Sequence, residues 1–139
     1  MLRVVLDTNV LVAAVLSPAS TPASLVRALH AGEYDAIACP ALLAELRGVL
    51  ARPAIASRIE ADAAASFADR FERTAILIPD PAEMPALSPD PSDDYLLALA
   101  SGGSAALLVT GDAHLGGLGI TTPRVLSPAA FARYLDAVR

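Results

Sequence analysis

Four acidic side chains stand in the sequence where a parallel α/β fold would bring them together. Asp7 and Asp112 each follow a short apolar run, Val4–Leu6 and Leu107–Val109, whose lack of alternation is typical of strands covered on both faces. Ligands of open α/β sheets bind outside the carboxyl ends of such strands, so both acids mark a candidate site. Each also has a plainer interpretation, because Asp is a good N-cap for a following helix and is common in turns.

Glu45 lies on the apolar flank of a helix expected over Pro40–Leu50. It follows Leu42 by three residues and precedes Val49 by four, which places all three on one side of the helix. None of its helical neighbours can pair with it, and an unpaired carboxylate beside an apolar stripe costs several kcal/mol unless something compensates. A metal ion is one compensation; water or a distant arginine at the margin of the stripe is the plainer one.

Asp93 and Asp94 open the helix that follows a proline-rich segment. Acids in a first helical turn stabilise it by about 0.3–1 kcal/mol each, which accounts for both without any site. Two adjacent acids point in different directions, so we expect at most one of them to share a site with Asp7. Asp94 is aligned with Leu97 and Ala98, but the spacing of Asp93 is nearly as good and does not separate the two.

A site built from these acids would suit a hard cation. Magnesium and manganese ions take oxygen ligands and keep several waters for substrate phosphates. Crowded carboxylates raise one another's pKa until a metal ion binds. Thr8, Asn9 and Thr110 stand beside the acids and are expected to orient the ligands or an attacking water. The sequence therefore predicts a Mg²⁺ or Mn²⁺ site with four ligands: Asp7, Glu45, Asp112 and one of the two adjacent acids, Asp93 or Asp94.

The elements that must position these residues alternate between strands and helices. Strands are expected at 4–6, 35–39, 76–78, 105–109 and 125–126. Helices are expected at 9–16, from Pro22 with Thr21 as N-cap, at 40–50 and 59–74, at 92–101 with Ser92 as N-cap, and at 128–138 with Ser127 as N-cap. This alternation predicts an α/β protein with a parallel sheet and helices on both faces.

Composition favours one domain over residues 1–139, since 55% hydrophobic and only 4% aromatic residues suit helices packed closely on a small sheet. No apolar run approaches the roughly 18 residues of a membrane span, and Asp7 and Asn9 interrupt any signal peptide. Cys39 is the only cysteine, which excludes an internal disulfide and a Cys-based zinc site. A net charge of −5 argues against a generic basic nucleic-acid binder. We expect a cytoplasmic protein.

Several segments resemble the PIN-domain nucleases, among them the VapC-like toxins of bacterial toxin–antitoxin pairs. Val4-Val5-Leu6-Asp7-Thr8-Asn9 is similar to the family's opening strand and first acid, and Glu45 to its helical second acid. The segment 90–100 is similar to the third motif, whose acid aligns best with Asp94, and 108–112 is similar to the fourth. Each motif is short, but their order and spacing together are specific and cover nearly the whole chain.

The resemblance implies a three-layer α/β/α fold with a parallel sheet of four or five strands. It implies a Mg²⁺- or Mn²⁺-dependent endoribonuclease that hydrolyses RNA phosphodiester bonds, with Asp7, Glu45, Asp94 and Asp112 as catalytic metal ligands. Asp93 then stands beside the ligands, as Thr8, Asn9 and Thr110 do, and acts mainly through the dipole of the helix that it opens. A homodimer and a small antitoxin partner are further implications. Phosphate contacts outside the site would fall to arginines nearby: Arg47, Arg52 or Arg58.

Other functions remain open at this point. An RNA-processing PIN nuclease without an antitoxin has the same acids as a toxin. A catalytically silent module that binds only RNA or protein is disfavoured, because no acid of the pattern is missing. A phosphotransfer or phosphatase domain that uses Asp7 as nucleophile would want a second acid or a lysine nearby, and all ten basic residues of this chain are arginines.

Overall fold

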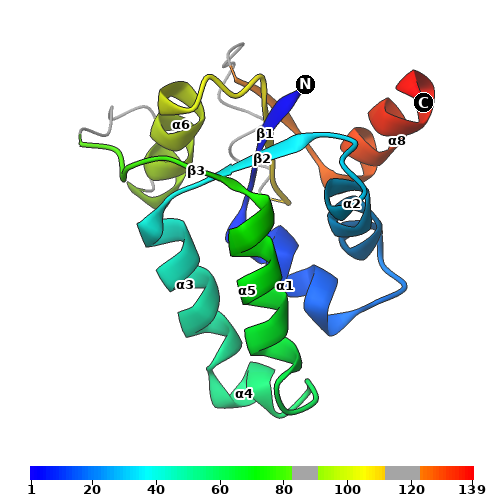
Figure 1. Ribbon diagram of the computed structural model, residues 1–139, viewed down its shortest axis with the longest axis vertical. Coiled ribbons are helices and arrows are strands. Elements are labelled where there is room, and N and C mark those ends of the chain that lie inside the picture. Colours follow the sequence, from blue (N-terminus) through cyan, green and yellow to red (C-terminus); the bar gives the residue numbers. More distant parts are fainter. Residues whose placement is uncertain (83–90, 112–122) are drawn as a thin grey trace.

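The computed structural model describes residues 1–82, 91–111 and 123–139. Five strands form one sheet in the order β3-β2-β1-β4-β5, and every neighbouring pair is parallel (Figure 1). The strands are β1 (Arg3–Leu6), β2 (Asp35–Ala38), β3 (Ile76–Leu77), β4 (Leu107–Val109) and β5 (Arg124–Leu126). The α/β fold with a parallel sheet is therefore confirmed.

Helices cover both faces of this sheet. Those that the structure describes are α1 (Thr8–Leu16), α2 (Thr21–His30), α3 (Pro40–Leu50), α4 (Pro53–Ala56), α5 (Ala63–Thr74), α6 (Pro91–Gly102) and α8 (Pro128–Val138). The chain passes from β1 to β2 to β3 in one direction and then returns to β4 and β5 beyond β1. Because crossovers between parallel strands are right-handed, this reversal puts α6 on the face opposite α1, α2, α3 and α5. The predicted three-layer α/β/α arrangement results.

The strand order reverses between β1 and β4, and we call the region beyond the carboxyl ends of these two strands the crevice, after the place where open α/β sheets bind ligands. These strands are neighbours, and their register pairs Val4 with Leu107 and Leu6 with Val109, so they end at the same level. The reversal of strand order between these two neighbours is a switch point, which is the position where open α/β sheets bind their ligands. Asp7 and Thr110 are the first residues beyond these two strand ends.

The core lies on both faces of the central strands. Every residue of β4, and every residue of β1 after Arg3, is buried, which explains why these apolar runs do not alternate with polar residues. Among the described residues no single helix is long and apolar enough to cross a membrane, although α1 and α2 reach that length and apolarity when taken together across a bend of 102°.

Four helix starts differ from the sequence predictions, and that of α1 differs least, because the helix begins at Thr8, one residue before its predicted start. Ser20, not Thr21, is the N-cap of α2, and its hydroxyl accepts a hydrogen bond from the Ala23 N–H at 3.3 Å. The helix predicted from residue 59 begins only at residue 63, because Asp62 adopts a left-handed backbone conformation (φ 71°) that no α-helix accommodates. α6 begins one residue before Ser92, which is therefore inside the helix, and a proline fills the first helical position.

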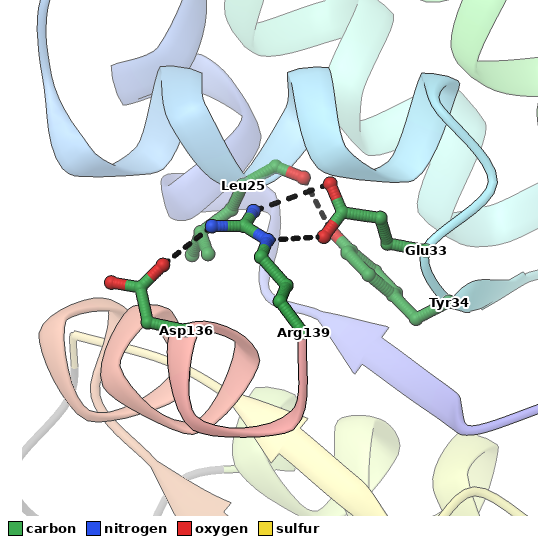
Figure 2. A network of polar contacts seen from close by, with 5 residues as sticks. All are labelled: Leu25, Glu33, Tyr34, Asp136 and Arg139. Atoms are coloured by element: carbon green, nitrogen blue, oxygen red, sulfur yellow. Dashed lines mark hydrogen bonds and ion pairs between the residues drawn. The ribbon is translucent and has the colours of Figure 1, made fainter.

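The final helix is attached to α2 and to the turn that precedes β2 (Figure 2). α8 begins after Ser127, whose hydroxyl accepts a hydrogen bond from the Ala130 N–H at 3.1 Å, as predicted. Phe131 is fully buried and meets Tyr34 edge to face with ring centroids 5.0 Å apart. The Tyr34 hydroxyl donates to the Leu25 carbonyl at 2.7 Å, which closes this corner of the core.

Candidate functional site

Asp7 combines a capping role with a place in the crevice. It is 9% exposed, and its Oδ1 accepts a hydrogen bond from the Asn9 N–H at 3.2 Å as the N-cap of α1. The plainer interpretation of this residue is thus correct for one oxygen. The other oxygen, Oδ2, accepts a hydrogen bond from the Thr110 hydroxyl at 2.7 Å. Asp7 is therefore held from β1, α1 and the end of β4, and its carboxylate has a defined orientation.

Glu45 lies on α3 close enough to Asp7 for their charges to interact. The residue is exposed overall, yet its pKa is raised, first by partial burial of the carboxyl group and then by repulsion from Asp7, while Arg52 acts in the opposite direction. Both causes disfavour a second negative charge at this position. The structure therefore brings together two of the four predicted acids, Asp7 and Glu45.

Asp94 stands in the first turns of α6 and is 6% exposed. This helix contacts β1, β2 and β4 and begins at the carboxyl side of the sheet, because it runs back towards the start of β4. Asp94 thus lies at the same edge of the sheet as Asp7, namely the edge formed by the carboxyl ends of the strands. The side chain of Asp93 and the whole of Asp112 lie outside the described residues, so these two predictions stay predictions.

The hydroxyl neighbours of Asp7 differ in their bonding. Thr110 is 3% exposed and orients Asp7 through the hydrogen bond given above. Thr8 is 1% exposed, and its Oγ1 has no hydrogen-bond partner among the residues that the structure describes. A buried hydroxyl without a partner costs about 1–3 kcal/mol, so a ligand or its water that reached this oxygen would be favoured. Asn9 contributes its backbone N–H to the cap of α1.

Oxygen donors from Asp7, Glu45 and Asp94 have the chemistry that Mg²⁺ and Mn²⁺ prefer. Within the described ranges, no three carboxylate, imidazole or thiol groups stand close enough together to hold a metal ion by themselves. What these ranges show is a buried, oriented carboxylate, a second carboxylate that it repels and an orphaned hydroxyl. A divalent cation would relieve the repulsion and could supply water to the hydroxyl, so the residues present fit such an ion.

A polar contact near this site joins residues that sequence reasoning did not connect. Cys39, which was interpreted as a small core residue, is fully buried, and its Sγ lies 2.9 Å from the Tyr95 hydroxyl oxygen. Asp80 accepts a hydrogen bond from the Ala41 N–H at 2.8 Å and so caps α3. The one local signal was the lack of a capping side chain before Pro40, which implied a cap from elsewhere.

The arginines named as phosphate ligands are not equivalent. Arg47 is engaged by two acids of α5, Asp69 at 2.9 Å and Glu72 at 3.3 Å. Arg52, at the N-cap of α4, lies near enough to Glu45 to lower that residue's pKa. Arg52, unlike Arg47, is therefore close to one of the predicted acids, Glu45.

Comparison with known families agrees with this geometry. A family model described as the PIN domain matches residues 3–114, a span that contains all four predicted acids. No curated protein and no solved structure matches the chain. PIN domains are generally nucleases and typically use divalent metal ions. With its parallel five-stranded sheet, its helices on both faces and a match over most of its length, the chain belongs to the PIN domain family.

Proposed function

We propose that this protein is a Mg²⁺- or Mn²⁺-dependent endoribonuclease with Asp7, Glu45, Asp94 and Asp112 as its metal ligands. The observation that carries the proposal is the proximity of Asp7 and Glu45 at the crevice between β1 and β4, where the carboxylate of Asp7 raises the pKa of Glu45. Two carboxylates that repel each other destabilise the fold when no cation is bound, and a divalent cation would offset that repulsion. Membership of a nuclease family supports a phosphodiester as the substrate.

The residues around the acids have separable tasks in this proposal. A bound divalent cation would supply an activated water and stabilise negative charge on the phosphodiester and its leaving oxygen. Thr110 holds Asp7 in one orientation, so that the ligand does not have to be ordered when substrate arrives. Arg52 would contact an adjacent phosphate and offset the repulsion between RNA and a chain of net charge −5.

The biological role that we propose is that of the toxin in a bacterial toxin–antitoxin pair, acting in the cytoplasm as a homodimer with a small antitoxin. This part rests on the resemblance of the acid motifs to VapC-like proteins. Expression of the wild-type chain should arrest growth, expression of Asp7→Asn should not, and co-expression of a short neighbouring reading frame should restore growth. Growth arrest by Asp7→Asn, or none by the wild type, would instead favour an RNA-processing nuclease or a different role.

The activity itself is tested with purified protein and a labelled model RNA. We expect cleavage with Mg²⁺ or Mn²⁺, none in excess EDTA, and a loss of orders of magnitude in Asp7→Asn. The matched control is Asp136→Asn, the same exchange in an exposed ion pair of α8, which should cleave like the wild type. Because the exchange removes repulsion on Glu45, Asp7→Asn should melt at the same or a higher temperature in metal-free buffer. Full cleavage in EDTA or by Asp7→Asn would refute the proposal.

A further inference from the structure

Three chain segments meet in a group of polar contacts beside the candidate site. We call this group the Cys39 junction, and it consists of Cys39, Asp80 and Tyr95. The Cys39 Sγ and the Tyr95 hydroxyl oxygen are 2.9 Å apart, which is hydrogen-bond distance. Cys39 directly follows β2 and is the N-cap residue of α3, whereas Tyr95 belongs to α6 on the opposite face of the sheet. The bond therefore joins two helices that start at the same edge of the sheet from different layers.

The surroundings of the Tyr95 hydroxyl raise its pKa and so keep it protonated, and the acids among these surroundings show that it lies near the candidate site. Its pKa is raised first by burial, then by the contact with Cys39, and further by the carboxylates of Asp80 and Glu45. Asp80 also caps α3 through the Ala41 N–H, so the start of that helix is tied to the same junction. A protonated tyrosine and a thiol can each donate one hydrogen bond, so either group can be the donor in the contact between Tyr95 and Cys39.

The two helices joined in this way carry predicted ligands. Glu45 is on α3, six residues after Cys39, and Asp94 immediately precedes Tyr95 on α6. Adjacent residues of a helix are separated by about 1.5 Å along the axis and about 100° around it, so a slide or rotation of α6 that breaks the tyrosine contact also moves Asp94. Small displacements of a ligand matter, because a metal ion requires its oxygens at defined distances.

We propose that Tyr95 is a positioning residue whose hydrogen bond to Cys39 sets the separation of Asp94 from Glu45 and Asp7. The inference rests on the proposed metal site, and it assigns to Tyr95 no contact with RNA or with the cation. Its consequence is that the junction contributes to the affinity of the protein for the ion. A tyrosine that served only the packing of α6 would contribute to folding stability and leave ion affinity unchanged.

The experiment measures the Mn²⁺ dissociation constant of the full chain from the electron paramagnetic resonance signal of free Mn²⁺, together with melting curves. Tyr95→Phe keeps the ring and removes the hydroxyl, and we expect its Mn²⁺ affinity to fall by about three- to tenfold, equivalent to one neutral hydrogen bond. Cleavage at saturating Mn²⁺ should recover towards the wild-type rate. The matched control is Tyr134→Phe, which removes the hydroxyl of a tyrosine exposed on α8 and should leave the affinity unchanged.

Variants of the other partner separate positioning from packing. Cys39→Ala should weaken Mn²⁺ binding as Tyr95→Phe does. Cys39→Ser should keep the wild-type affinity, because its hydroxyl can still bond to the tyrosine. The double variant Tyr95→Phe/Cys39→Ala should bind Mn²⁺ no more weakly than either single variant. The inference is wrong if Tyr95→Phe melts lower but binds Mn²⁺ like the wild type, or if Cys39→Ser and Cys39→Ala bind it equally. A wild-type protein that binds no Mn²⁺ would refute the proposed function itself, and this inference with it.

Discussion

Two clusters of charged residues in this protein are built on opposite principles. In the corner between α2 and α8, Arg139 bonds to both oxygens of Glu33, at 2.6 and 3.2 Å, and pairs with Asp136 (Figure 2). At the crevice between β1 and β4, two carboxylates, Asp7 and Glu45, stand near each other. One cluster contains its own countercharge, and the other has an excess of negative charge.

The two glutamates report this difference directly. The pKa of Glu33 is lowered, chiefly by the hydrogen bond from Arg139, whereas the pKa of Glu45 is raised by burial and by Asp7. A lowered carboxyl pKa means that the fold favours the charge, and a raised one means that it opposes the charge. The α8 corner is therefore complete without a ligand, while the crevice would gain from a cation.

The largest effect that we expect is a loss of cleavage activity, and it distinguishes two adjacent acids of α6, Asp93 and Asp94. Asp94→Ala should lose cleavage by orders of magnitude with little loss of stability, because it removes a metal ligand. Asp93→Ala should keep most of the activity and lose under ~1 kcal/mol of stability through the helix dipole. Single-turnover cleavage of a model RNA at saturating Mn²⁺, with melting curves, measures both. If Asp93→Ala is inactive and Asp94→Ala is active, the third ligand has been assigned one residue out of register.

The second effect belongs to the α8 corner and concerns stability alone. Phe131 is fully buried against Tyr34, so Phe131→Ala should lower the free energy of unfolding by about 3–5 kcal/mol. Tyr134→Ala, which removes the exposed ring stacked on Phe131, is the control and should cost much less. Denaturant unfolding gives both values. A change in the Mn²⁺ affinity of folded Phe131→Ala would show that the two regions are not independent.

The smallest effect is a pair of pH dependences with opposite sign, measured in metal-free buffer. Because the pKa of Glu45 is raised above 4.5, the wild type should match Glu45→Gln in stability at low pH and become less stable than it as the pH rises through that pKa. The pKa of Glu33 is lowered below 4.5, so the wild type should exceed Glu33→Gln at neutral pH and lose this advantage as the pH falls. Melting temperatures between pH 3 and 7, about the range that spans these titrations, provide the test. If the stability differences of the two variants from the wild type changed with pH in the same direction, the contrast between the two clusters would be contradicted.

The sequence by itself determined the elements whose signals are local. The apolar runs of β1 and β4 predicted buried parallel strands, and the helix over Pro40–Leu50 has the bounds that its periodicity and its proline indicated. Ser127 caps the last helix as predicted, because capping involves only residues within one turn. The same locality made Ser20 and Thr21 hard to separate, since either hydroxyl could have capped α2.

Only the tertiary structure decided which residues meet. The bond between Asp7 and Thr110 spans 103 positions in the sequence, and that between Cys39 and Tyr95 spans 56. Both depend on the strand order and on the face to which each crossover goes, which hydrophobic periodicity does not encode. The raised pKa of Glu45 has the same origin, because repulsion from Asp7 arises only when α3 packs against α1, the helix that Asp7 caps. Residue types identified the candidate ligands, and long-range packing placed them relative to one another.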